Sequence, residues 1–192
     1  MLLLLLGKSK SGKDTIGNYL VEKKGWIKFK FATIMKEALK TLFNWDNYTI
    51  EEKKDEIDPY WDISPRFIFQ NMGTEYLRVN LNFLKKKAIE FNGKKFYATF
   101  HIKRIHKEII KNLQENKNIV ICDGRFKDEC TYTNWLEGKI IKLDRNTDII
   151  DEHSSEQIDD IKTYDILLQN NGTKEELYEK IEEIIKNYDT IS

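Results

Sequence analysis

The stretch LLLLLGKSKSGKDT, residues 2–15, decides the fold of this chain. A run of five leucines precedes a lysine-rich loop between two glycines, and a segment with helical character follows. A buried strand, a glycine loop and a helix are the context that a phosphate-binding loop requires. The glycines let the main chain turn so that its N–H groups and the positive end of the helix form a cradle for polyphosphate. The pattern predicts a nucleoside triphosphate site that begins at Gly7.

The residue after the last lysine of this loop departs from the usual motif. Lys13 would reach the β- and γ-phosphates as a point charge, and the motif then has Ser or Thr to touch Mg²⁺. Here Asp14 takes that position, and the hydroxyl comes one place later, at Thr15. Because a carboxylate is a good ligand for Mg²⁺, we expect an altered metal site and not a lost one. The alternative is a lysine-rich turn that binds nothing.

Length and composition narrow the class of protein. A chain of 192 residues predicts one compact α/β domain. Its 32 basic and 32 acidic residues cancel, so no net field favours nucleic acid or membrane as a partner. The leucine run is too short to span a bilayer and lacks the features of a signal peptide. Cys122 and Cys130 show no metal or redox spacing, which predicts free thiols in a reducing cytoplasm.

Strands and helices alternate along most of the chain. The expected strands are 2–6, 27–31, 118–122, 139–143 and 164–168. The expected helices are 13–24, 32–43, 101–116, 126–136 and 173–188. This alternation predicts a parallel sheet with helices on both faces, and ligands at the carboxyl ends of its strands.

The middle of the chain is less regular. Residues 46–64 predict a loop with one helical turn. Ser64-Pro65 then resembles an N-cap with proline at the first helical position, opening a helix to about Met72. A second helix is expected from Thr74 to Phe91, and Asn92-Gly93 predicts a turn. Residues 144–163 carry many charges without a clear period, and we expect them to be mobile.

Two further segments carry side chains suited to phosphate chemistry. Asp123-Gly124-Arg125 follows a strand, where Asp123 could hold Mg²⁺ and Arg125 could grip a phosphate with two hydrogen bonds. The alternative is an Asp that caps the next helix, with the arginine on the surface. In SPRFIFQNMGTEYLR, residues 64–78, Arg66 and Gln70 share a helix face and Arg78 follows a glycine break. These groups suit an acceptor with a phosphate and a base; the alternative is an ordinary helix pair with solvated charges.

Two loops late in the chain are weaker candidates. Arg145 leads the charged segment after a strand, and such a segment can close over a transferring phosphate and exclude water. His153 could bind the acceptor or order this segment, although a solvated loop is the alternative. The turn LQNNG, residues 168–172, could pass beside the adenine of a nucleotide. Its alternative is a plain turn with a helix cap at Thr173.

Together these blocks resemble the deoxynucleoside monophosphate kinases of bacteriophages and large viruses, which are adenylate-kinase-like P-loop kinases. The resemblance extends from Leu2 to about Ile185. It rests on the order and spacing of GKSKSGKDT, FKFATIMKEAL, SPRFIFQNMGTEYLR, IVICDGRFKDE, HSSE and YDILLQNNGTKEEL. It implies a single three-layer α/β domain with a core of residues 1–45 and 95–192, a helical acceptor-binding region at about 46–94 and a lid at about 144–160.

The resemblance also implies the reaction and its residues. The γ-phosphoryl of ATP would pass to a deoxynucleoside monophosphate with Mg²⁺ as cofactor, by positioning and charge neutralisation without a covalent protein intermediate. The implied catalytic residues are Lys13, Asp123, Arg125 and Arg145. The implied ATP site comprises Gly7, Lys8, Ser9, Lys10, Ser11, Gly12, Lys13, Asp14, Thr15, Asn171 and Gly172. The implied acceptor site comprises Arg66, Gln70, Arg78, His153 and Glu156. The implied metal ligands are Asp14, Thr15 and Asp123. A homodimer is an option.

Some features leave alternatives open. The family usually shows an Asp and a Trp soon after Gly-Thr-Glu, whereas this chain has VNLNFL at 79–84, so those roles are not carried over. The basic segment 85–110 has no functional account. Phosphomevalonate kinase shares the GKD loop, and dephospho-coenzyme A kinase ends in a similar turn and helix. A nucleotide-binding switch or ATPase is a further alternative, but it would not need the second phosphate pocket that residues 66–78 suggest.

Overall fold

The computed structural model describes the chain except for residues 82–86, 147–157, 159 and 190–192. The chain divides into two compact units. The first, which we call the sheet unit, comprises Met1–Phe29 and Ile109–Ser192, and the second, the helical unit, comprises Lys30–Glu108. The boundary falls within helix α5 (Phe100–Gln114). The expected division into a core, an acceptor-binding region and a lid stays a prediction.

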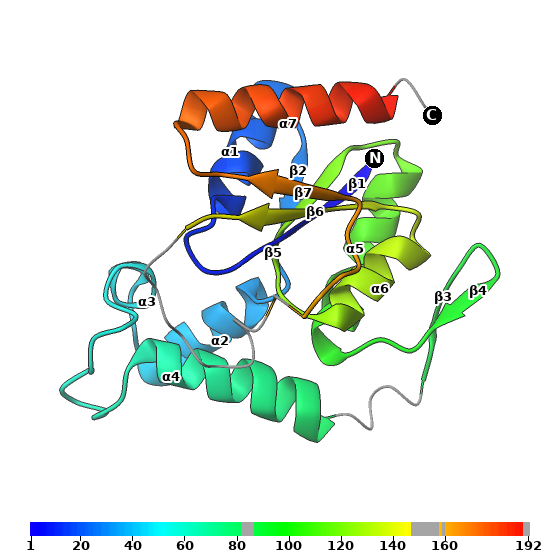
Figure 1. Cartoon of the computed structure of the whole chain (residues 1–192). Coiled ribbons are helices and arrows are strands. Elements are labelled where there is room, and N and C mark those ends of the chain that lie inside the picture. Colours follow the sequence, from blue (N-terminus) through cyan, green and yellow to red (C-terminus); the bar gives the residue numbers. More distant parts are fainter. Residues whose placement is uncertain (82–86, 147–157, 159, 190–192) are drawn as a thin grey trace. The chain divides into compact units, whose positions relative to one another are not determined.

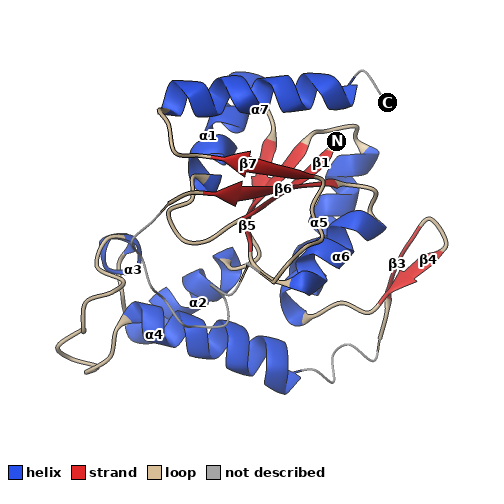
Figure 2. Ribbon diagram, viewed as in Figure 1, coloured by secondary structure: helices blue, strands red, loops and turns tan. Residues whose placement is uncertain are grey.

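The sheet unit is built on five parallel strands in the order β2-β5-β1-β6-β7, as Figures 1 and 2 show. The strands are β1 (Leu2–Leu6), β2 (Ile27–Phe29), β5 (Ile119–Gly124), β6 (Lys139–Asp144) and β7 (Ile166–Gln169). All five leucines of β1 are buried, because β1 is the central strand and both faces of the sheet are covered. The predicted parallel α/β sheet is confirmed.

Helices cover both faces of this sheet. Helix α1 (Lys13–Lys24) and helix α7 (Lys174–Asp189) contact each other on one face, and α6 (Lys127–Trp135) packs against β1 and β6. On the first face the core is formed by alternate strand residues, such as Leu3 and Leu5, with Ile16 of α1. The strand order places β1 between β5 and β6, so the loop after β1 lies at a switch in strand order. In such sheets this crevice is where ligands bind.

The helical unit contains short helices and a hairpin. Its elements are α2 (Thr33–Phe43), α3 (Asn47–Glu51), α4 (Pro65–Gln70), the π-helix η1 (Asn71–Val79), and strands β3 (Ile89–Phe91) and β4 (Lys94–Phe96). The predicted N-cap of α4 is confirmed, since Ser64 Oγ accepts a hydrogen bond of 3.2 Å from Phe67 N. The single predicted helical turn within 46–64 is α3.

The predicted break at Gly73 is wrong. Helix α4 runs directly into η1, and Gly73 lies inside that π-helix. A Cβ on Gly73 would lie 2.9 Å from Met35 Sδ, so this glycine allows a close approach to α2. Its carbonyl oxygen is 2.9 Å from His101 Nε2, a partner on α5. The glycine at position 73 is therefore explained by packing against α2 and α5, and not by the end of a helix.

The predicted helix from Thr74 to Phe91 is also wrong at its end. Residues 89–91 form β3, which pairs in antiparallel fashion with β4. The turn between the strands is confirmed, and both of its residues have positive φ, 48° at Asn92 and 74° at Gly93. This is the backbone geometry that Asn-Gly favours in a two-residue hairpin.

The remaining predicted helices and strands are confirmed, with ends that shift by a few residues; β2, for example, ends at Phe29 and not at Phe31. The segment 144–163, which is predicted to be mobile, falls largely outside the described residues. Cys122 and Cys130 are free, as predicted, and both are buried. Within the described ranges, no helix combines the length and the apolar composition that crossing a membrane needs.

Candidate functional site

The loop after β1 has the backbone shape that its sequence predicts. Lys10 and Gly12 have positive φ values of 59° and 106°. A Cβ on Gly12 would collide with Asn170 Nδ2, and a Cβ on Gly7 would lie 2.5 Å from Ser11 Oγ. Gly12 is therefore required by its backbone conformation as well as by the space around it, and a side chain at Gly7 would have to displace the Ser11 hydroxyl.

Asn170 holds this loop in place from the far end of the chain. Its Nδ2 donates 2.8 Å to the Ser11 carbonyl, and its own N–H donates 2.8 Å to the Asp144 carbonyl. Asn170 is only 5% exposed, so both bonds lie in the protein interior. Asn170 thus joins the end of β7 to the loop through its side chain and to the end of β6 through its main chain. Sequence reasoning named the neighbouring Asn171 and Gly172 but not Asn170.

Asn171 and Gly172 lie in the same turn. Asn171 Oδ1 accepts a hydrogen bond of 2.9 Å from Asn146 N, which joins this turn to the end of β6. The helix cap that was the alternative explanation is present, because Thr173 Oγ1 accepts a hydrogen bond of 3.2 Å from Glu176 N. The contact of Asn171 and Gly172 with a nucleotide stays a prediction.

Lys13 is folded beneath the loop that precedes it. Its Nζ donates to the carbonyls of Gly7 and Lys8, both at 2.6 Å, and to Ser11 Oγ at 3.3 Å. The residue is 6% exposed. Burial, with a smaller contribution from the charge of Arg125, lowers the Lys13 pKa to about 7. An anionic ligand would favour the charged form and offer the ammonium better acceptors than carbonyl oxygens.

A β-bulge places Asp123 beside the loop. Leu4 pairs with Ile121 and Leu6 with Gly124, so β5 has one residue more than β1 between these pairs. Bulges re-aim side chains and are common next to active sites. The charges of Asp123 and Arg125 act on Lys13 in opposite senses, so the structure brings these three predicted residues together.

Glu129 fixes the main chain that follows the bulge. Its Oε2 accepts hydrogen bonds from Arg125 N at 2.7 Å and from Phe126 N at 3.0 Å, and the residue is buried. The N-terminus of α6 is therefore capped by Glu129. The sequence signal was a glutamate at the third position of a helix, but Phe126 is an unusual N-cap residue.

The role of the predicted metal ligands stays a prediction. Asp14 is 59% exposed and forms an ion pair of 2.9 Å with Lys28 of β2. In the described part of the chain, no three His, Cys, Asp or Glu residues cluster so as to hold a metal ion by themselves. Mg²⁺ usually takes one or two carboxylates together with substrate phosphates and water. Asp14 and Asp123, whose charges both act on Lys13, suit such a shared site.

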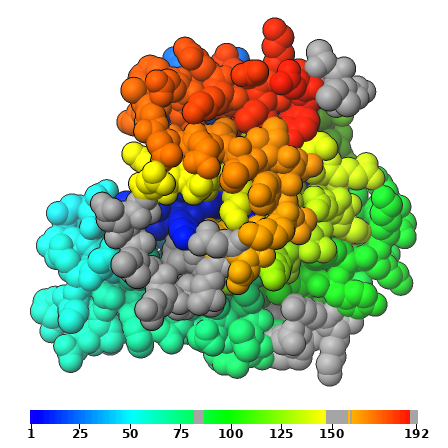
Figure 3. Space-filling view, viewed as in Figure 1, coloured from blue at the N-terminus to red at the C-terminus, as the bar shows by residue number. Residues whose placement is uncertain are grey.

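Arg145 also lies at the loop. Its Nη1 is 3.5 Å from the Lys10 carbonyl, a long contact from the end of β6. Figure 3 shows blue atoms of the first residues at the surface beside yellow atoms of the β6 region. His153 and Glu156 fall outside the described residues.

The helical unit carries the other three predicted residues. The Arg66 guanidinium pairs with the Asp55 carboxylate, through Nε to Oδ1 and through Nη2 to Oδ2 at 3.4 Å. Gln70 and Arg78 are partly buried, like Arg66. Phe67 and Asn71, which directly follow Arg66 and Gln70, are exposed.

The π-helix helps to keep Arg66, Gln70 and Arg78 on one side of the helix. An α-helix has about 3.6 residues per turn, so residues four apart overshoot a full turn. A π-helix has wider turns, so residues four apart fall short of one. Passing from α4 into η1 therefore offsets the drift along the row of positions 66, 70, 74 and 78.

The glycine loop on a parallel sheet defines a P-loop kinase fold. Similar solved structures include a shikimate kinase from Aquifex aeolicus vf5, with a TM-score of 0.50, 16% identity and coverage of 99% of both chains. A dephospho-CoA kinase from Campylobacter jejuni has a TM-score of 0.53 and 16% identity, covering 97% of this chain and 98% of that one. At these identities the likeness shows the fold alone.

Sequence comparison gives the family. The family model described as deoxynucleotide monophosphate kinase matches residues 89–181. A protein of Acanthamoeba polyphaga mimivirus, described as "Putative deoxynucleotide monophosphate kinase", is 34% identical over 197 residues that cover 97% of each chain. This chain therefore belongs to the deoxynucleotide monophosphate kinase family, and it is an enzyme, a nucleotide kinase. The predicted resemblance is confirmed, and a switch without a kinase activity is set aside.

Proposed function

We propose that this kinase transfers the γ-phosphoryl group of ATP to a deoxynucleoside monophosphate and forms the diphosphate. ATP as the phosphoryl donor is supported by the glycine loop, with Lys13 beneath it and Asp123 and Arg125 beside it. Membership of the family supports the acceptor half.

On the donor side, the loop N–H groups and the start of α1 bind the β- and γ-phosphates. Lys13 exchanges its carbonyl partners for phosphate oxygens, while Arg125 and Arg145 neutralise charge that develops on the transferring group. Asp14, Thr15 and Asp123 would hold Mg²⁺, which supplies further charge neutralisation when bound.

On the acceptor side, Arg66, Gln70 and Arg78 hold the monophosphate. The attacking atom is an oxygen of the acceptor phosphate, which is already anionic, so no strong general base is required and none is assigned. His153 and Glu156 are proposed to contact the acceptor, and Arg145 to help exclude water. Catalysis then depends on holding the two phosphates in line.

Two aspects of the setting belong to the same proposal. The buried free thiols of Cys122 and Cys130 support a reducing, cytoplasmic location. ATP and the deoxynucleotide are the partners we propose, together with a homodimer as an option.

A coupled assay tests this proposal. ATP and Mg²⁺ are supplied with each deoxynucleoside monophosphate in turn, and separately with phosphomevalonate and with dephospho-coenzyme A. We expect turnover with one or more deoxynucleotides and with neither of the other two compounds. Turnover with dephospho-coenzyme A alone, or with phosphomevalonate alone, would contradict the proposed acceptor and keep the donor.

A further inference from the structure

Three cationic side chains of the helical unit, which come from three different segments, lie near one another. Lys36 comes from α2, Lys54 follows α3, and Arg66 belongs to α4. The main chain ties two of them together, because Arg66 N donates 2.8 Å to the Lys54 carbonyl. Lys36 Nζ lies 2.9 Å from Glu51 Oε1 and 5.6 Å from the ring centre of Phe69, which is three residues after Arg66.

The cluster places positive charges close together at a half-buried position. Burial lowers the Lys54 pKa, and the charges of Arg66 and then Lys36 lower it further. The carboxylates of Asp55 and Glu51 act in the opposite sense, and each acts less strongly than either cation. Gathering like charges where water is partly excluded is unfavourable for the unliganded protein. Such an arrangement is common where a site awaits an oppositely charged ligand.

We propose that Lys36, Lys54 and Arg66 together form the subsite for the phosphate group of the acceptor nucleotide. This inference rests on the proposed function and adds two lysines to its acceptor site. Asp55 holds the Arg66 guanidinium in the unliganded protein, and the phosphate takes its place.

The chemistry of the cluster matches a phosphomonoester. Its charge at neutral pH is close to −2, and it offers three acceptor oxygens. The Arg66 guanidinium can donate two parallel hydrogen bonds to two of these oxygens. The two lysine ammonium groups can act as point charges that neutralise the phosphate. Asp55 can leave readily, because its side chain is 60% exposed and exposed ion pairs are weak.

The test measures binding of a deoxynucleoside monophosphate by calorimetry, without ATP. The variants are Lys54→Met and Lys36→Met, which keep the length of the side chain and remove the charge. We expect Kd to rise by about 10-fold or more in each, a usual loss when a charged hydrogen bond is removed. Lys54→Arg keeps the charge and should keep most of the affinity. The nucleoside without its phosphate should bind every variant equally.

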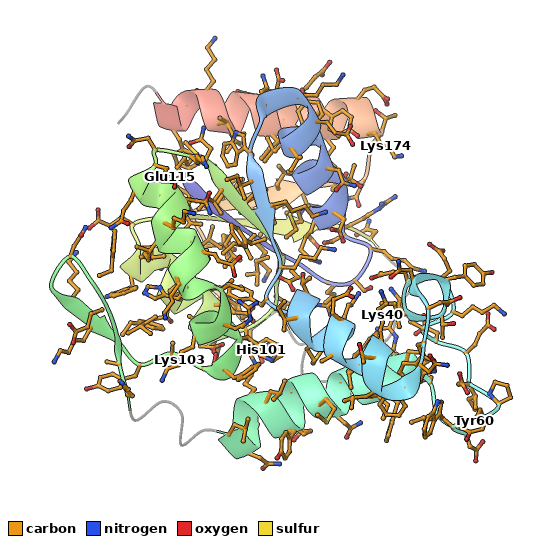
Figure 4. The ribbon with its side chains drawn as sticks, turned by 180° about the vertical axis from the view of Figure 1, so that it is seen from behind. Lys40, Tyr60, His101, Lys103, Glu115 and Lys174 are labelled. Atoms are coloured by element: carbon orange, nitrogen blue, oxygen red, sulfur yellow. The ribbon has the colours of Figure 1, made fainter. Side chains whose placement is uncertain are left out.

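The chain offers two matched controls. Lys53 is the neighbour of Lys54 and pairs with Glu56 at 3.2 Å on the surface. Lys40 lies on α2 like Lys36 and pairs with Glu37 at 3.2 Å, and Figure 4 shows it there. Lys53→Met and Lys40→Met should leave Kd unchanged.

Removing the competing carboxylate gives a test in the opposite direction. Asp55→Asn should lower Kd for the nucleotide by about 3-fold, in line with the loss of a weak exposed ion pair. A purely structural role for this pair predicts no tighter binding.

The outcomes separate the two proposals. If the wild type binds a deoxynucleotide but Lys54→Met and Lys36→Met bind it equally well, the phosphate subsite is wrong and the proposed function stands. If affinity falls as much in Lys53→Met and Lys40→Met, the effect is general charge and the subsite is again wrong. If the wild type binds no deoxynucleotide, both proposals fail.

Discussion

The two proposed phosphate sites hold their cations in different ways. In the sheet unit, Lys13 is buried and its ammonium group is bound by main-chain carbonyls of its own loop. In the helical unit, Arg66 is held by Asp55, a carboxylate that is largely exposed. In the first site the main chain fixes the position of the cation, so a change there should disturb the whole loop. In the second site a side-chain ion pair fixes it, so single changes there should have smaller and separate effects.

The largest effect is expected at Lys13. Lys13→Met removes the charge that binds the transferring phosphate, and kcat should fall by about 10²-fold or more. Lys23→Met, an exposed lysine in the last turn of the same helix, should not change kcat. Steady-state assays compare the two. A Lys13→Met enzyme with near-normal kcat would show that the donor site lies elsewhere.

A pair of glycine variants separates backbone strain from site geometry. Gly12→Ala must adopt a φ of 106° and collides with Asn170, whereas Gly25→Ala adopts a φ of 68° with no atom within 4 Å of its Cβ. Both should lose stability by about 1–3 kcal/mol through backbone strain. Only Gly12→Ala should also weaken ATP binding, as urea melts and calorimetry can show. Equal ATP affinity in the two variants would contradict the role given to Gly12.

The acceptor side should respond more narrowly. Arg66→Ala should raise the acceptor KM by about 10-fold, as expected when a charged hydrogen bond is lost, and leave the ATP KM unchanged. Arg104, an exposed arginine of α5 that pairs with Glu108 at 3.0 Å, provides the control. Unchanged acceptor KM and kcat in Arg66→Ala would remove this residue from the site.

The smallest expected effect is the uptake of a proton by Lys13 when ATP binds. The Lys13 pKa is lowered to about 7 by burial, so at pH 8 the unliganded protein holds Lys13 mostly neutral. Polyphosphate favours the charged form and raises this pKa, so ATP binding at pH 8 should take up part of a proton. Calorimetry in buffers of different ionisation enthalpy measures this uptake, once the protonation of free ATP at the same pH has been subtracted. Lys13→Met should abolish the difference, and uptake that persists in this variant would assign the proton to another group.

The same pKa has a consequence for stability. The unfolded chain binds a proton at Lys13 up to its ordinary value of 10.5, while the folded chain loses it above about 7. The unfolded state therefore binds more protons between these values, and this residue makes stability rise with pH across that window. Lys13→Met should show a flatter pH dependence of the unfolding free energy there.

The contrast between the sites also explains what the sequence could predict. The loop is a continuous motif whose chemistry lies in the main chain, so its residues were found together. Asn170 was missed because it lies 159 positions from Ser11, its hydrogen-bond partner. Glu129 was missed because its partners follow a bulge that no periodicity reveals. Lys36 and Lys54 belong to different segments, and only the fold brings them near Arg66.

The errors in the fold have similar causes. Gly73 favoured a break in the sequence, but contacts with Met35 and His101 favour a π-helix that continues. For the hairpin, a local signal was present in Ile89, Phe91 and the Asn92-Gly93 turn, where apolar alternation meets the strongest two-residue turn. The helical pattern of the preceding residues was extended too far across it.

Transfer of label tests the central claim most directly. ATP labelled at the γ-phosphate is incubated with the wild-type enzyme, Mg²⁺ and a deoxynucleoside monophosphate, and the products are separated. The account predicts label at the β-phosphate of the deoxynucleoside diphosphate, and its loss in Lys13→Met. Label that appears only as inorganic phosphate, or that reaches the diphosphate equally well in Lys13→Met, would contradict it.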